Sequence, residues 1–161
     1  LANEGKGELL HIANGEDLRY YHLVVVNHRL NTVALNASVH WIAIEVFVNG
    51  IYETHTFPPI RMRWPYEGEG KIEHRQNIQT EQYVDLCLID RSQVSLQVQR
   101  EILSYRTTLL LNGQRKFKMH FEIRADNFTS EKPTVVSIDW NGLWSDDDLV
   151  MARNMVLSKA L

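Results

Sequence analysis

The chain has 161 residues, of which 44% are hydrophobic and 23% charged, and its formal net charge is −3. This composition excludes a disordered chain, and the charge provides no general attraction for nucleic acid, so nucleic-acid binding is disfavoured. We expect one domain over residues 1–161 and no membrane span, because no window approaches the roughly 18 apolar residues that cross a bilayer.

Cys87 is the only cysteine, so the chain cannot form an internal disulfide. This fits a reducing cytoplasm, which is slightly favoured, and it also fits an extracytoplasmic domain that folds without bridges. Because the sequence begins with Leu1 rather than Met, we expect a processed form or a fragment of a longer protein.

Alternation of apolar and polar residues predicts a series of strands from the N-terminus onward. The expected strands are 9–13, 18–26, 33–48, 60–64, 83–89, 94–98, 117–125 and 134–140. The alternation is clearest in 117–125, where Phe117, Met119 and Phe121 share one face. Seven or more short strands predict a mostly β fold, an antiparallel immunoglobulin-like β-sandwich.

Two local signals refine this prediction. In 33–48 the alternating apolar residues occupy odd-numbered positions up to residue 41 and even-numbered positions from residue 42. This change predicts a bulge near residues 40–42, or else a strand that crosses between sheets. Asn49-Gly50 and Asn112-Gly113 predict type I′ hairpin turns, because both residues of such a turn need positive φ. The segments 65–79 and 125–133 are predicted to be exposed loops.

A C-terminal helix is expected over about 146–161, where the chain contains no Gly or Pro. Ser145 followed by three aspartates is typical of a helix start. Apolar residues occupy so much of the helix circumference that we expect contact with the sandwich or with a second subunit. The residues predicted to form that interface are Met151, Met155 and Leu157.

The same acidic stretch allows a metal hypothesis. Asp139, which precedes a Trp-Asn-Gly turn, together with Asp146, Asp147 and Asp148 resembles part of a calcium loop. The EF-hand spacing is absent, and helix capping already explains the last three aspartates. Capping is therefore the preferred interpretation, and calcium, the one cofactor considered, is the alternative.

A basic and aromatic group lies before the first long loop. Arg61, Arg63, Trp64 and Tyr66 could stack on a sugar or base or hold an acidic partner. The preferred interpretation is a strand edge protected by charge, with Trp64 half buried, and a binding surface is the alternative. These four residues are the predicted ligand or partner surface.

The segment Tyr20–Asn27 followed by Val33–Val39 resembles the first hairpin of bacterial accessory immunoglobulin-like domains related to cell-adhesion modules. In those domains a strand that ends in Asn leads through a turn to an Ala-x-Asn-x-x-Val strand. The turn here is His28-Arg29-Leu30-Asn31, without the Gly usual in those families. The resemblance implies a noncatalytic module and assigns no site residues.

The favoured function is therefore a noncatalytic binding or assembly module, bacterial and part of a larger protein or complex, with a protein partner or a second copy of itself. One alternative is a calcium- or ligand-binding sandwich of the C2-like type. The other is an enzyme whose site is assembled from separate strands.

Overall fold

The computed structural model describes residues 7–11, 17–29, 31–65, 75–91, 95–98 and 115–160. The strands of the first half are β1 (Glu8–His11), β2 (Asp17–Val26), β3 (Ala34–Val48), β4 (Ile51–Arg61), β5 (Gln76–Ile78) and β6 (Glu81–Asp90). Those of the second half are β7 (Ser95–Val98), β8 (Lys116–Ala125), β9 (Phe128–Thr129), β10 (Thr134–Trp140) and β11 (Met155–Ala160), with the helix α2 (Asp148–Asn154) before β11.

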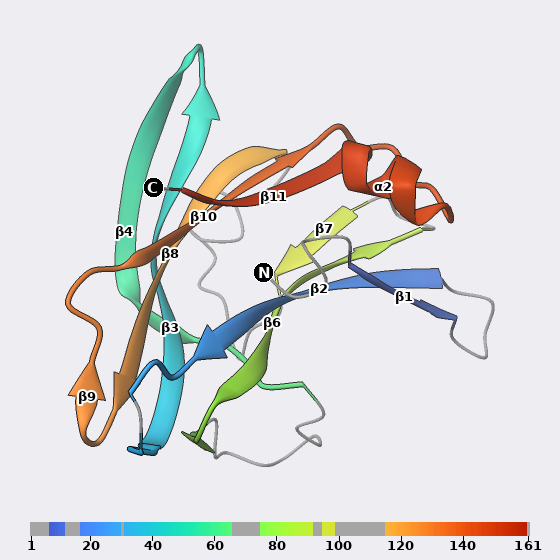
Figure 1. Cartoon of the computed structure of the whole chain (residues 1–161). Coiled ribbons are helices and arrows are strands. Elements are labelled where there is room, and N and C mark those ends of the chain that lie inside the picture. Colours follow the sequence, from blue (N-terminus) through green and yellow to red (C-terminus); the bar gives the residue numbers. More distant parts are fainter. Residues whose placement is uncertain are drawn as a thin grey trace.

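These strands form two antiparallel sheets (Figure 1). The smaller sheet has the order β1-β2-β6-β7. The larger sheet has seven strands, with the order β11-β10-β8-β3-β4 and with β5 and β9 added beside β3 and β8. The predicted mostly β, antiparallel architecture is confirmed, and two sheets around a shared core fit a β-sandwich.

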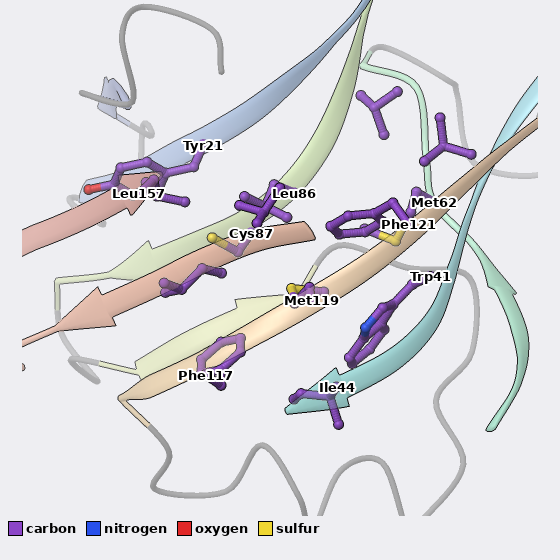
Figure 2. Close-up of a cluster of buried hydrophobic side chains, with 14 of the residues drawn as sticks. Tyr21, Trp41, Ile44, Met62, Leu86, Cys87, Phe117, Met119, Phe121 and Leu157 are labelled. Carbon is purple, nitrogen blue, oxygen red and sulfur yellow. The ribbon is translucent and has the colours of Figure 1, made fainter. Parts of the chain in front are cut away.

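The core lies between the two sheets (Figure 2). The larger sheet contributes Trp41 and Phe117, and the smaller one contributes Tyr21 and Leu86, all at most 2% exposed. Fully burying a side chain of this size contributes about 1.5–3 kcal/mol, so this layer is the main source of stability. Cys87 lies in the same layer, and burial raises the pKa of its thiol well above the ordinary range.

The segment after β4 links the two sheets. The Met62 amide donates to the Val39 carbonyl of the larger sheet at 3.0 Å, and the Asp85 amide of β6 donates to the Arg63 carbonyl at 2.9 Å. Between these bonds, the side chains of Met62 and Trp64 are each 1% exposed within the core. The chain thus crosses from one sheet to the other while it buries apolar side chains.

The bulge predicted near residues 40–42 is confirmed. β3 pairs with β4 and β8 through Trp41 and again from Ala43, so Ile42 is the extra residue. Because one extra residue reverses the facing of all that follow, Trp41 and Ile44 both reach the core. The Asn49-Gly50 turn is also confirmed, with φ values of 50° and 91°. Asn112-Gly113 lies outside the described residues.

The predicted helix over 146–161 is wrong in its length and in its start. The helix α2 begins at Asp148 and ends at Asn154, and its N-cap is Asp147 rather than Ser145, with the Asp147 carboxylate accepting from Leu149 and Val150 amides. Met155 then begins β11, which pairs with β10 along its whole length. A strand that completes a sheet satisfies its backbone groups and buries alternate side chains, and this outweighs local helix propensity.

Both predicted loops contain a short strand. β5 lies within 65–79 and pairs with β3, while β9 lies within 125–133 and pairs with β8. Residues 66–74 lie outside the described part of the chain. In the part that the structure describes, no helix is long and apolar enough to cross a membrane.

Candidate functional site

The predicted ligand surface of four basic and aromatic residues is divided by the fold. Trp64 belongs to the core, so its ring packs against protein and is not exposed for stacking. Arg61 and Arg63 are partly exposed, and Tyr66 lies outside the described residues. The two arginines therefore remain as the predicted binding groups, without the aromatic ring beside them.

The four aspartates of the calcium hypothesis have separate partners. Asp139 lies 3.3 Å from Lys116, Asp146 lies 3.3 Å from Arg91, and Asp147 caps the helix. Asp148 accepts from the Arg19 guanidinium at 2.7 Å. Among the described residues, no group of three or more His, Cys, Asp or Glu side chains is placed to hold a metal ion.

The predicted interface residues belong to the core of this chain. Met151 and Met155 are at most 1% exposed and Leu157 is 9% exposed. Along β11 the side chains alternate, so Val156, which is 48% exposed, faces outward instead. Leu149 of α2 is also exposed, at 70%.

The described surface contains a pocket of about 250 Å³ at one end of the sheets, near β9 and the start of β3 at the lower left of Figure 1. We call it the end pocket. Its apolar lining is formed mainly by Val25, Val33, Ala37, Ile78, Ile123 and Phe128. These residues come from β2, the segment before β3, β3 itself, β5, β8 and β9, so the pocket depends on both sheets.

Two asparagines fix the loops around the end pocket. The Asn27 side-chain amide donates to the carbonyls of Thr32 at 2.6 Å and Ile78 at 3.0 Å. On the other side, the Asn127 amide donates to the Val33 carbonyl at 2.9 Å. Side chains that satisfy loop carbonyls in this way hold the backbone in one conformation. The pocket is thus formed before any ligand arrives.

Arg29 carries the positive charge at the end pocket. Its guanidinium carbon lies 4.5 Å from the centroid of the Phe128 ring, which is a cation–π contact. Among the described residues, no carboxylate lies within ion-pair distance of Arg29. An exposed guanidinium beside an apolar pocket can bind an anionic group while the pocket binds an attached apolar group.

The sequence reasoning did not identify this pocket. Its lining residues come from six short segments, and none of those segments carries a motif of its own. A usable signal was present in the asparagines: Asn27 and Asn127 each lie beside an apolar strand end, and Asn31 and Asn36 have positive φ. Asparagine is the residue that most often combines a left-handed backbone with loop hydrogen bonds.

Comparisons of this chain with protein-family models, with curated proteins and with solved structures give no match.

Proposed function

We propose that this protein is a noncatalytic binding module whose end pocket takes a short apolar chain or ring that carries an anionic group. The observation that carries this proposal is the Arg29 guanidinium, which lies over the Phe128 ring beside a mostly apolar pocket and has no carboxylate partner among the described residues. A cavity of about 150 Å³ holds benzene. A pocket of about 250 Å³ is therefore large enough for a chain of six to ten carbons or a two-ring system.

Within the same proposal we infer an immunoglobulin-like arrangement. Such domains have one sheet in the order A-B-E-D and another in the order G-F-C-C′. β1 and β2 correspond to A and B, while β10, β8, β3 and β4 correspond to G, F, C and C′. β6 and β7 occupy the positions of E and D in the sheet. In the standard domain D precedes E along the chain, whereas here the strand in the E position, β6, comes first. This difference distinguishes the chain from the standard domain.

Octanoate is a suitable probe, because it combines a carboxylate with a tail that the end pocket can hold. We expect octanoate to bind saturably and to raise the melting temperature, because a ligand that binds only the folded state stabilises it. Acetate, which lacks the tail, and 1-octanol, which lacks the charge, should each bind more weakly. Titration calorimetry of the full chain with the three compounds measures the separate contributions of charge and tail.

Two variants assign the binding to the end pocket. Arg29→Gln should weaken octanoate about tenfold, because it removes a charge-assisted contact. Ala34→Leu should abolish binding, because Ala34 lines the pocket and a larger side chain fills it. Arg153→Gln and Ala152→Leu make the same changes on α2 and should bind octanoate as the wild type does. Equal affinity in all four variants would contradict the proposal.

A further inference from the structure

A second group of polar residues lies on the outer face of the larger sheet, away from the core. Ser38 and His40 alternate with Val39 and Trp41 of β3, and the latter two face the core. Ser38 and His40 therefore face outward, yet they are only 5% and 7% exposed. The Ser38 hydroxyl and His40 Nε2 lie 2.9 Å apart in a hydrogen bond. A buried polar pair on an outer sheet face is uncommon and requires a reason.

Charged side chains surround His40 on the neighbouring strands. Arg61 of β4 and Glu122 of β8 are its direct cross-strand partners. Arg124 lies one pair further along β8, beside Ser38. Arg75 directly precedes β5. It lies near the position on β3 where pairing with β5 ends and pairing with β4 begins. Three guanidinium groups thus meet at one place on this face.

Among the charged residues that the structure describes there, the positive charges exceed the negative ones. Arg124 pairs with Glu122 at 2.7 Å, and Arg75 lies 3.8 Å from Asp126. Arg61 has no carboxylate within ion-pair distance among the described residues. The cluster therefore keeps one uncompensated guanidinium next to the buried imidazole, which favours an anion.

His40 has an unused hydrogen-bonding atom. Its Nδ1 is buried and has no hydrogen-bond partner in the part of the chain that the structure describes, while Nε2 is occupied by Ser38. Burial first, and then the charges of Arg124 and Arg61, lower the pKa of His40 from 6.5 to about 4, so the ring is neutral at neutral pH. When Ser38 donates to Nε2, the single ring proton lies on Nδ1 as a donor without an acceptor. Buried donors of this kind are normally satisfied.

We propose that His40 Nδ1–H and the Arg61 guanidinium together bind a compact oxyanion, a phosphate or carboxylate group, on the outer face of the larger sheet. The oxyanion supplies the acceptor that Nδ1 lacks, and its charge compensates that of Arg61. A planar guanidinium fork matches two oxygens of either group. The site is independent of the end pocket, since they share no residue.

The site binds an anion and does not use the Ser38–His40 pair as a nucleophile and base. In a catalytic pair the second ring nitrogen is held by an orienting group, and the imidazole titrates near neutral pH. Here no residue that the structure describes holds Nδ1 in this way, and the low pKa of His40 makes it a weak base.

The test follows the imidazole of His40 by nuclear magnetic resonance on the full chain labelled with nitrogen-15 in histidine. Inorganic phosphate and acetate are titrated separately, each against sodium chloride at equal ionic strength. We expect one of the two anions, or both, to shift the His40 signals saturably and to raise the pKa of His40, because a bound anion favours the imidazolium. The comparison of the two anions identifies the preferred oxyanion chemistry.

Three variants make the test specific. Arg61→Gln should weaken anion binding about tenfold, because a charge-assisted contact is lost. Arg61→Lys keeps the charge without the fork and should bind with intermediate affinity. Arg29→Gln, which alters only the end pocket, should bind the anion as the wild type does. The proposal is overturned if neither anion moves the His40 signals beyond the chloride control, or if Arg61→Gln and Arg29→Gln bind equally well.

Discussion

Arg19 lies near the start of β2, Arg29 lies just beyond the end of this strand, and the two arginines have opposite surroundings. Arg19 is completely buried, and its guanidinium donates to the Asp148 carboxylate at 2.7 Å and to the Ser145 and Asp146 carbonyls at 3.3 Å. Arg29 is exposed, and its guanidinium lies over the ring of Phe128. The first arginine joins the smaller sheet to the start of α2, while the second has donors available at the mouth of the end pocket.

This difference separates a residue that the fold requires from a residue that is available to a ligand. Burying a charge costs much free energy unless protein acceptors compensate it. A buried arginine whose donors point at such acceptors is therefore part of what holds the fold together. A cation left with unused donors beside a pocket is not needed for the fold and is available for a ligand. Substitutions at the two ends of β2 should therefore change different properties of the protein.

The largest effect is expected for Arg19→Ala. The substitution removes the hydrogen bonds to Asp148, Ser145 and Asp146 and leaves a void next to α2, so the free energy of unfolding should fall by about 3 kcal/mol. Urea denaturation followed by circular dichroism measures the change. The matched control is Arg91→Ala, because Arg91 is half exposed and solvent weakens its pairs with Asp17 and Asp146, so the loss should be much smaller than for Arg19→Ala. Similar losses in the two variants would remove the distinction between buried and exposed arginines.

The next effect tests the strand that replaces the end of the predicted helix. Met155→Ala should lower the free energy of unfolding by about 2 kcal/mol, because Met155 is buried in the core. Val156→Ala should cost less than about 1 kcal/mol, since Val156 faces outward. The same urea measurements on both variants decide the point. A larger loss for Val156→Ala would mean that β11 has a different register.

The sequence predicted the parts of the fold that depend on neighbouring residues. The alternation in β8 reveals its buried face, and Asn49-Gly50 reveals its hairpin, because strand period and turn chemistry are local properties. β4 was harder to recognise before residue 60, because Pro58 and Pro59 interrupt it. The structure tolerates them because β4 is an edge strand, and its register with β3 jumps from Ile60 to Thr56 there.

The remaining features depend on pairings between distant segments. Residues 155–160 form a strand because they pair with the edge of β10. The sequence of this segment contains no signal for that pairing. The end pocket and the anion site also combine side chains from several strands each. A single sequence shows which residue types are present, such as the asparagines and Arg61. It does not show which of them lie close together in the folded chain. This is why Trp64 was expected half buried at a strand edge and lies in the core.

A smaller effect concerns the pH dependence of stability and the buried His40. The unfolded chain takes up a proton on this histidine near pH 6.5, whereas the folded chain resists protonation until about pH 4. As the pH falls through this window the unfolded state is favoured, so folded stability is lost on acidification and is fully present above pH 6.5.

His40→Gln should remove this contribution. The free energy of unfolding of the variant should depend less steeply on pH between 4 and 6.5, by up to about 1.4 kcal/mol per pH unit within this window. Urea denaturation at a series of pH values measures the two slopes. His28→Gln makes the same substitution at an exposed histidine and serves as the matched control. Parallel profiles for His40→Gln and the wild type would show that His40 titrates normally in the folded protein.

The smallest effect on stability is expected for Arg29→Gln. The loss in this variant is compared directly with the loss in Arg19→Ala. Because Arg29 is exposed and contacts only one ring in the described structure, its loss should change the free energy of unfolding by less than about 0.5 kcal/mol. In the presence of octanoate, however, the wild type should gain stability that the variant does not, since stabilisation follows ligand affinity. Thermal melts of both proteins with and without octanoate measure this difference. A variant that is destabilised without ligand, and equally stabilised with it, would place Arg29 with Arg19 as a structural residue.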